Sequence, residues 1–214
     1  MMSKQWFDFD NLVEQDGLYY VRRSSRRKFL IQDNFYVLFT GEVTGTVEYG
    51  VGELCQYFGY MKDGKWEGEH LTYYKNRQLQ KKGNYKDGKK EGEQLRYRAD
   101  GLLKDKKNWK EGKREGEQLR YYVNGQLKTI ANYKDGKDEG ELLWYYDNGQ
   151  LKENRNYKDG KLEGEIFYYY KSGQLWIKNN YKNGKLEGER LVYYENGQLE
   201  KTEIYKNGLC SLKP

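Results

Sequence analysis

Hydrophobic and polar positions alternate along the chain in short runs, such as GEQLRYY at residues 116–122 and QLKTIANYK at residues 126–134. These runs are rich in Tyr and Leu, and they lack the 3.6-residue periodicity of an amphipathic helix. Asn-Gly and Asp-Gly dipeptides separate them, and these are strong hairpin signals because both central residues of a type I′ turn need φ > 0. The pattern therefore predicts antiparallel strands joined by tight turns.

The same pattern recurs every 24 residues from about residue 63 onward. Its unit reads Tyr-Lys-Asp-Gly-Lys-x-Glu-Gly-Glu-x-Leu-x-Tyr-Tyr-x-Asn-Gly-Gln-Leu, followed by a variable stretch. A fixed period of this length indicates a repeat architecture in which each unit contributes one supersecondary element. The glycine of one turn marks the period, at Gly64, Gly88, Gly112, Gly136, Gly160, Gly184 and Gly208.

The period divides the chain into four segments. Residues 63–208 contain six full repeats, and residues 39–62 contain a degenerate one. Residues 1–38 are expected to form an N-terminal cap, of the polar and atypical kind that the ends of repeat arrays need. Residues 209–214 are expected to form a C-terminal tail. The predicted fold is all-β, an elongated single-layer antiparallel meander of 24-residue repeats with two strands each.

The turns also predict which side chains face one another. If each Asn-Gly dipeptide forms a two-residue loop, Tyr122 faces Leu127, and Tyr133 faces Gly116. A tyrosine ring is then expected to cover the bare glycine, as in the aromatic rescue of strand glycines. A bulge in the longer second strand would shift this parity. The same arithmetic places Tyr157 over Gly140 and Tyr181 over Gly164.

Composition narrows the class of protein. Only 36% of the residues are apolar and 34% are charged, with a mean hydropathy of -1.18, so a thick aliphatic core is excluded. The abundance of Tyr and Gly, with a single Pro, separates the chain from disordered ones. No window resembles a transmembrane helix, and the N-terminus lacks the pattern of a signal peptide. We therefore expect a cytoplasmic protein, with Cys55 and Cys210 as free thiols.

The repeat unit resembles a known family. Gly-rich and Tyr-rich two-strand units of this length are similar to MORN repeats. Tyr-Tyr-x-Asn-Gly-Gln-Leu together with Tyr-Lys-Asp-Gly-Lys-x-Glu-Gly resembles the bacterial variant found in YwqK-family antitoxins. The segments DGLYY at residues 16–20 and FTGEVTG at residues 39–45 also resemble the beginning of such proteins, although RRSSRRK and a longer insert within residues 21–35 depart from it. The resemblance implies a toxin as partner.

The sequence offers little for catalysis. Glu115 and Glu117 form a pair of carboxylates, as glycoside hydrolysis requires, but Glu-Gly-Glu recurs through the repeats, whereas a catalytic pair is built once. His70 is the only histidine and is expected to be an exposed strand residue. No spacing of potential ligands matches a zinc or calcium site. We therefore expect no catalytic residues, no metal, no cofactor and no small-molecule substrate.

The positions between the Gly/Tyr and Tyr/Leu pairs differ from repeat to repeat. They are polar and basic in the early repeats and apolar or aromatic in the later ones. A single-layer sheet has nothing of its own to bury them against, and contiguous exposed apolar surface usually marks a contact site. Packing of the N-terminal cap, or a dimer of the kind seen in crystals, is the structural alternative. The residues expected to bind a partner are Leu142, Trp144, Ile166, Tyr168, Ile177, Arg96 and Arg120.

A second candidate surface is basic. The net charge is +6, and a cluster of arginines lies in the N-terminal segment. Arg and Lys alternate with aromatic residues as in proteins that bind single-stranded nucleic acid, and anionic lipid would be attracted by the same charge. Because Lys and Glu are interspersed in every repeat, the field is diluted, and these ligands rank below a protein partner. The cluster consists of Arg22, Arg23, Arg26 and Arg27.

These observations together predict a non-enzymatic protein-binding module that docks a partner protein on its repeat face. The resemblance implies an antitoxin or immunity-like protein with a cognate toxin as that partner. Two other functions stay open. One is a structural scaffold that self-associates through its edge strands, and the other is an adaptor for anionic lipid or nucleic acid.

Overall fold

The structure is a computed structural model. The residues that it describes are 12–15, 18–22, 36–38, 41–49 and 53–211. None of them belongs to a helix long and apolar enough to cross a membrane. They divide into two compact units: the first contains the described residues up to Leu103 together with Trp109–Gly112, and the second contains Lys104–Asn108 and the described residues from Lys113 onward.

Strands make up the regular structure of the described residues. In most repeats a first strand of nine residues is followed by a second of eight, and in the last two repeats the first strand is split. The strands are β1 (Leu12–Gln15), β2 (Leu18–Arg22), β3 (Tyr36–Leu38), β4 (Gly41–Tyr49), β5 (Glu53–Lys62), β6 (Lys65–Tyr73), β7 (Leu79–Lys86), β8 (Lys89–Tyr97), β9 (Leu103–Lys110), β10 (Lys113–Tyr121), β11 (Leu127–Lys134), β12 (Lys137–Tyr145), β13 (Leu151–Lys158), β14 (Lys161–Leu162), β15 (Gly164–Tyr169), β16 (Leu175–Lys182), β17 (Lys185–Leu186), β18 (Gly188–Tyr193), β19 (Leu199–Lys206) and β20 (Leu209–Ser211).

The first unit contains two antiparallel sheets. Strands β1, β2 and β3 form a small sheet in that order. Strands β4 to β8 form a meander in which each strand pairs with the next along the chain. The segment predicted to be a degenerate repeat therefore folds as a hairpin of β4 and β5, in unbroken register from Gly41 opposite Met61 to Tyr49 opposite Glu53.

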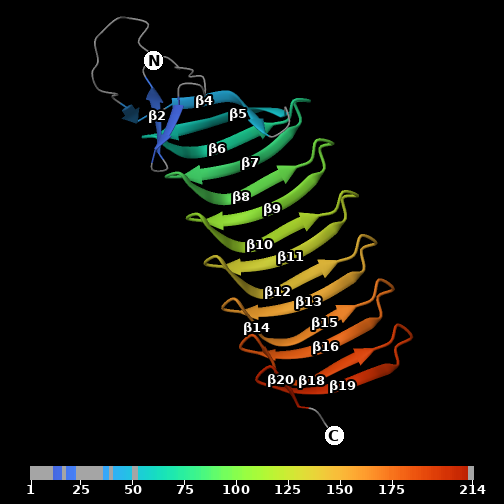
Figure 1. Cartoon of the computed structure of the whole chain (residues 1–214). Coiled ribbons are helices and arrows are strands. Elements are labelled where there is room, and N and C mark those ends of the chain that lie inside the picture. Colours follow the sequence, from blue (N-terminus) through green and yellow to red (C-terminus); the bar gives the residue numbers. More distant parts are fainter. Residues whose placement is uncertain (1–11, 16–17, 23–35, 39–40, 50–52, 212–214) are drawn as a thin grey trace, which may run out of the picture. The chain divides into compact units, whose positions relative to one another are not determined.

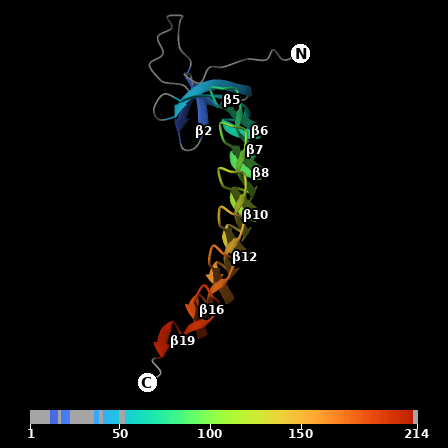
Figure 2. The ribbon, with the colours of Figure 1, turned by 90° about the vertical axis from the view of Figure 1, so that its right-hand side faces the viewer.

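The second unit is also an antiparallel meander, from β10 to β20. Figure 1 shows its strands following one another in sequence order, and the turned view in Figure 2 shows a single layer of strands from β10 onward. The split strands keep this order, because β14 and β15 both pair with β13, and β17 and β18 both pair with β16. The predicted all-β meander of two-stranded repeats is confirmed within the units.

The Asp-Gly dipeptides form the predicted type of turn. Asp135 has a φ of 52° and Gly136 a φ of 86°. Both central residues thus lie in the left-handed region, as a type I′ turn requires. The turn joins β11 to β12 and places Lys134 opposite Lys137. The same pair of positive φ angles occurs at the equivalent turns of the other repeats.

The second turn of each repeat, such as the one at Asn124-Gly125, differs from the predicted type I′ turn. Only the glycine has a positive φ there, 82° at Gly125, and its N–H donates to the main-chain oxygen of Tyr122 at 3.1 Å. Asn183-Gly184 and Asn207-Gly208 stand at the first turn, and both of their residues have φ > 0. A type I turn followed by a left-handed glycine makes a longer loop than a type I′ turn, so Tyr121 lies opposite Leu127. The predicted pair of Tyr122 and Leu127 is therefore wrong. The register shifts here, and Lys128 lies over the Tyr122 ring at 5.2 Å.

The Gly/Tyr pairs have the predicted register but a different cause. Gly140 lies opposite Tyr157, yet a Cβ on Gly140 would have no atom within 4 Å, so the tyrosine ring does not require a bare backbone. Gly140 has a φ of 74°, and it lies where the ladder between β11 and β12 shifts register. Glycine is therefore needed for a bulge with φ > 0, and the expectation of aromatic rescue is wrong. The equivalent pairs are Gly116 with Tyr133 and Gly164 with Tyr181.

Side chains bond to the main chain of the next repeat and tie successive repeats together. The Glu115 carboxylate accepts a hydrogen bond from the Asp135 N–H at 2.9 Å. The Tyr122 hydroxyl donates to the main-chain oxygen of Tyr145 at 2.7 Å. Bonds of both kinds recur in other repeats. The first carboxylate of the Glu115 and Glu117 pair is thus a structural brace that holds a turn.

Candidate functional site

One face of the second unit collects most of the positions predicted to bind a partner. Residues paired across a ladder share a face. Arg120 lies opposite Thr129, which in turn lies opposite Trp144. A second row on the same face runs through Gln118, Ala131 and Leu142. We call this surface the pocket face; its two rows comprise Arg120, Thr129, Trp144, Glu153, Tyr168 and Ile177, and Gln118, Ala131, Leu142, Arg155, Ile166 and Asn179.

Side chains on the pocket face bury one another, although the unit is a single layer. Gln118 and Thr129 are each 6% exposed, and Ile166 is 0% exposed. Paired side chains on neighbouring strands stand about 5 Å apart, which is close enough for each to shield the next. The expectation that these positions are all exposed is therefore wrong, and Ile166 has no exposed surface with which to contact a partner. The half-buried candidates are Leu142, Trp144, Tyr168 and Ile177.

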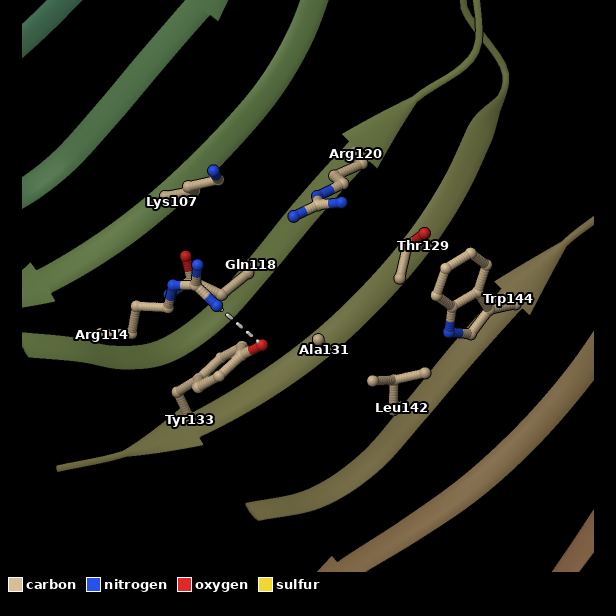
Figure 3. A pocket seen from close by; sticks show the side chains of 9 residues that line it. All are labelled: Lys107, Arg114, Gln118, Arg120, Thr129, Ala131, Tyr133, Leu142 and Trp144. Carbon is tan, nitrogen blue, oxygen red and sulfur yellow. Dashed lines mark hydrogen bonds between the residues drawn. The ribbon is translucent and has the colours of Figure 1, made fainter. Parts of the chain in front are cut away.

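A hollow of about 90 Å³ opens on the pocket face, and we call it the Ala131 pocket (Figure 3). Leu142 and Trp144 lie on one side of Ala131, and Arg114 and Gln118 lie on the other. Pockets for small molecules measure about 300–1,000 Å³, so this one has the size of a single side chain. Its lining residues are Lys107, Arg114, Gln118, Arg120, Thr129, Ala131, Tyr133, Leu142 and Trp144.

The Ala131 pocket exists because Ala131, which is 6% exposed, has a much smaller side chain than its neighbours on the pocket face. At the equivalent position in the first unit, Gly83 is covered by Gln94, whose Oε1 lies 1.9 Å from where a Cβ would stand. The Gln94 amide is held there by a 2.7 Å hydrogen bond to the main-chain oxygen of Asn84. Beside Ala131 the equivalent residue is Leu142, which has no amide to make such a bond. Other repeats carry larger residues at the position of Ala131: Lys107, Arg155, Asn179 and Glu203.

Three buried polar atoms of the pocket lining have no hydrogen-bond partner. They are Gln118 Oε1, Thr129 Oγ1 and Trp144 Nε1. An unpaired buried polar group costs about 1–3 kcal/mol, and most buried polar atoms in proteins are paired. All three belong to residues that line this small hollow. The Gln118 amide nitrogen, by contrast, donates to the main-chain oxygen of Asn108 at 2.8 Å.

The lining of the Ala131 pocket is positively charged. It contains Lys107, Arg114 and Arg120, and no acidic side chain. The Arg114 guanidinium donates to the Tyr133 hydroxyl at 3.0 Å and lies 5.0 Å from the ring centre, which holds it at the pocket wall. Burial, followed by a hydrogen bond with Asp138, raises the pKa of Tyr133, so its hydroxyl stays neutral. The Lys107 ammonium lies 3.9 Å from the carboxylate of Asp105, a buried residue outside the lining, so part of this charge is already compensated.

A paired carboxylate adjoins the pocket on the same face. Glu153 lies opposite Trp144 and is 7% exposed. Its carboxylate accepts a hydrogen bond from Arg155 Nε at 2.5 Å, which neutralises both groups. Burial, followed by the charge of Glu153, raises the pKa of Tyr168 to about 12. The Tyr168 hydroxyl therefore stays protonated at neutral pH and is unsuited to act as a base.

His70, in the first unit, is not the exposed strand residue that the sequence predicted. It is half-buried, and its ring makes edge contacts with Trp66 at 4.6 Å and Tyr85 at 5.7 Å between ring centres. Burial, followed by repulsion from Lys81, lowers the pKa of His70 to about 4. The imidazole is thus neutral at physiological pH and serves as a packing group.

The lowered pKa of His70 predicts acid sensitivity. Between pH 6.5 and about pH 4 the unfolded chain binds a proton at this site and the folded chain does not, so stability present above pH 6.5 is lost as the pH falls through this window. Gln94 and Gln118 occupy the position equivalent to His70 in the next two repeats, so the fold should accept His70→Gln. Glutamine does not titrate, and this variant should therefore not lose stability through protonation at residue 70. The drop in melting temperature from pH 7 to pH 4 should be larger in the wild type, and an equal drop would contradict the buried neutral imidazole.

The structure brings together some of the predicted partner-binding residues. Leu142, Trp144 and Arg120 line one pocket. Tyr168 and Ile177 lie farther along the same face, and Arg96 lies on β8 in the first unit. Their part in binding stays a prediction. The small residue among larger ones at one position of the period was a usable signal for the pocket. The predicted partner-binding residues did not include six of the lining residues: Lys107, Arg114, Gln118, Thr129, Ala131 and Tyr133.

The structure describes only one residue of the predicted basic cluster. Arg22 is the last residue of β2, and Arg23, Arg26 and Arg27 lie outside the described residues. Among the residues that the structure does describe, no group of three or more His, Cys, Asp or Glu side chains could hold a metal ion. The Ala131 pocket is therefore the feature on which a functional argument can be built.

Comparison with known proteins identifies the repeats. The model of a family described as MORN repeat variant matches residues 66–87, 114–135, 138–159, 162–183 and 186–207, which together make up just over half of the chain. Each matched stretch contains one hairpin and ends at the first residue of the next tight turn. Most of the pocket lining lies within the second and third stretches. No curated protein matches the chain.

Proposed function

The chain belongs to the MORN repeat variant family, and we propose that it is a non-enzymatic module that docks a partner protein on its pocket face. Repeats of this family generally bind proteins or membranes. The Ala131 pocket is the observation that supports this face as the docking surface. Its lining combines apolar side chains with buried polar atoms that have no hydrogen-bond partner. Tryptophan anchors set in such hollows dominate many protein interfaces.

The size of the pocket favours a protein over a small-molecule ligand. A hollow of about 90 Å³ receives one side chain, and the rest of the contact has to come from the surrounding surface. The sheet supplies this surface, because Tyr168 and Ile177 continue the row of Trp144 across neighbouring strands. A partner protein can cover several of these strands at once.

A more specific proposal concerns the kind of partner. The similarity of the repeat unit to the variant in YwqK-family antitoxins supports a toxin that this chain neutralises by occupying it. On this proposal the rigid ladder of hairpins presents the pocket, and the residues around the pocket select the toxin. No covalent step is required, because neutralisation by binding needs only affinity and coverage.

The test compares capture by two matched tryptophan variants. Full-length chain is immobilised and exposed to extract of the native host, in parallel with Trp144→Ala and with Trp176→Ala. Trp176 is 41% exposed and lies outside the pocket, so it is the control. Proteins that dock in the pocket should be retained by the wild type and the control, and they should bind Trp144→Ala at least tenfold more weakly, as truncation of a hot spot of about 2 kcal/mol implies.

A captured protein is then purified and titrated, and it is also expressed alone and together with this chain. If this chain neutralises a toxin, the captured protein should arrest growth when it is expressed alone. Co-expression of the wild-type chain should restore growth, and co-expression of Trp144→Ala should not. Equal affinity for the wild type and Trp144→Ala would move the docking site away from the pocket face. A captured protein that is harmless when expressed alone would remove the toxin proposal and leave the binding module.

Self-association is the second candidate function. The last hairpin exposes Leu199 by 54% and Leu209 by 75%, and exposed apolar side chains on strands at the end of a sheet favour pairing with another chain. Sedimentation velocity over a range of concentrations separates the two functions. A dimer that persists on dilution, and that Leu209→Lys dissociates, would favour a scaffold.

A further inference from the structure

The chemistry of the Ala131 pocket names the kind of segment that fills it. We propose that the pocket binds an acidic segment of the partner protein, in which an Asp or Glu carboxylate enters the pocket and a neighbouring apolar side chain packs against Leu142 and Trp144. This inference rests on the proposed function, because it describes the partner of the same face. It is argued from the charge, the hydrogen-bonding groups and the shape of the lining.

The positive charge of the pocket lining favours an anionic ligand group. Lys107, Arg114 and Arg120 line the hollow, and no acidic residue does. Lys107 is paired with Asp105 outside the lining, so Arg114 and Arg120 supply the charge for an anion. Arg114 is held by its hydrogen bond and ring contact with Tyr133, so part of the positive charge is positioned before a ligand arrives. Arginine presents its donors in a planar fork that matches the geometry of a carboxylate. A carboxylate in the pocket would therefore be paired with charge that is already in place.

The unpaired polar atoms select a group that accepts hydrogen bonds. Trp144 Nε1 carries a hydrogen and can only donate, and the Thr129 hydroxyl can also donate. The two oxygens of a carboxylate accept several hydrogen bonds at once. Gln118 Oε1 needs a donor, which the main-chain N–H of an extended segment supplies. Gln118, Thr129 and Trp144 all line the pocket.

The surroundings of the pocket favour a short acidic segment over a polyanion. The carboxylate of Glu153 lies one strand beyond Trp144 and is paired with Arg155. A strand of nucleic acid or a charged membrane needs a continuous row of free cations, and on this side of the pocket the row stops. Leu142, Ala131 and Trp144 give the hollow an apolar side, which suits an apolar residue next to the acidic one.

One substitution separates pocket binding from attraction by charge alone. Ala131→Arg fills the hollow and adds a positive charge, and the fold should accept it because Arg155 occupies the equivalent position one repeat later. A segment that enters the pocket should bind this variant at least tenfold more weakly. A polyanion held by surface charge should bind it more tightly. The two modes thus predict effects of opposite sign.

The experiment selects peptides from a phage-displayed random library on the full-length chain. The probe is the peptide of the most enriched clone, synthesised with a fluorophore and titrated by fluorescence anisotropy. Enriched peptides should share an Asp or Glu next to Leu, Ile, Phe or Trp. Changing that acid to its amide in the peptide, and Arg120→Gln in the chain, should each weaken binding about tenfold, since charge-assisted hydrogen bonds are lost.

Control variants test whether the change in peptide affinity comes from the Ala131 pocket. Lys201→Gln removes a positive charge from the same face outside the pocket, and Glu203 keeps Arg190 as a partner, so this variant should bind the peptide as the wild type does. Circular dichroism melts establish that every variant is folded. Vesicles containing phosphatidylserine and a single-stranded oligonucleotide are titrated in parallel with the peptide.

Each of three results would overturn the inference. The first is a set of enriched peptides without the acid, or a loss of less than threefold on amidation of the acid. The second is unchanged or tighter peptide binding by Ala131→Arg. The third is binding of vesicles or oligonucleotide in the absence of any peptide binding. If the peptides fail while capture of a host protein still depends on Trp144, the proposed function stands and only the acidic segment is wrong.

Discussion

Gly140→Val should lower the free energy of unfolding by about 2 kcal/mol, because an L residue in the left-handed region costs about 1–2 kcal/mol and a β-branched side chain fits that region least well. Gly140 has a φ of 74° at the bulge between β11 and β12. The loss is a backbone effect, since a Cβ at this position meets no atom within 4 Å. Chemical denaturation followed by circular dichroism measures it.

Two companion variants separate the backbone effect from a clash with the opposite ring. Gly140→Asn should cost least of the substitutions, because Asn enters the left-handed region more readily than other non-glycine residues. Tyr157→Ala should not rescue Gly140→Val, so the two changes should add within about 0.5 kcal/mol in a double-mutant cycle. Rescue by Tyr157→Ala, or equal costs for Asn and Val, would restore the ring of Tyr157 as the reason for the glycine.

Ile166→Ala should lower the free energy of unfolding by about 2–5 kcal/mol, the usual range for truncation of a buried aliphatic side chain. Ile166 is 0% exposed, although its sheet is a single layer, because the rows of side chains on the pocket face shield it. Ile166→Val, which removes one methylene, should cost about 0.5–1.5 kcal/mol. Denaturation midpoints of the two variants test whether Ile166 belongs to a core.

Val123→Ala is the matched control for an aliphatic truncation, since Val123 is 69% exposed and its loss should change stability by less than about 0.5 kcal/mol. Affinity provides the second readout. Folded Ile166→Ala should bind the partner as the wild type does, whereas folded Trp144→Ala should bind it weakly. A stable Ile166→Ala with reduced affinity would place Ile166 in the interface after all.

The fold could be predicted from the sequence because short turn and strand signals specify it, and these signals recur every 24 residues. The Asp-Gly turn demands two residues with φ > 0, and the structure has them at Asp135 and Gly136. A tight turn fixes the register, and register fixes which side chains share a face. The pairing of Lys134 with Lys137 follows from this turn. The pairing of Gly116 with Tyr133 is predicted from a two-residue loop at Asn124-Gly125; that loop is longer, and the register shift between Arg120 and Tyr121 restores the predicted pair.

The turn at Asn124-Gly125 could not be predicted from the local sequence alone. An Asn-Gly dipeptide is compatible with a type I′ turn and with a type I turn followed by a left-handed glycine. The two differ in loop length, and that difference places Tyr121, not Tyr122, opposite Leu127. The choice depends on contacts with the next repeat, such as the bond from the Tyr122 hydroxyl to the Tyr145 main chain. No pattern within a single repeat contains them.

Burial and the pocket were decided by the tertiary structure alone. The sequence by itself determined the strands, the repeats, one turn type and the face on which Ala131, Leu142 and Trp144 lie. It did not determine that Ile166 is buried or that a hollow opens beside Ala131. Both depend on which way long side chains lean across neighbouring strands. Such rotamers are chosen by hydrogen bonds and packing between residues of different strands, which sequence order does not record.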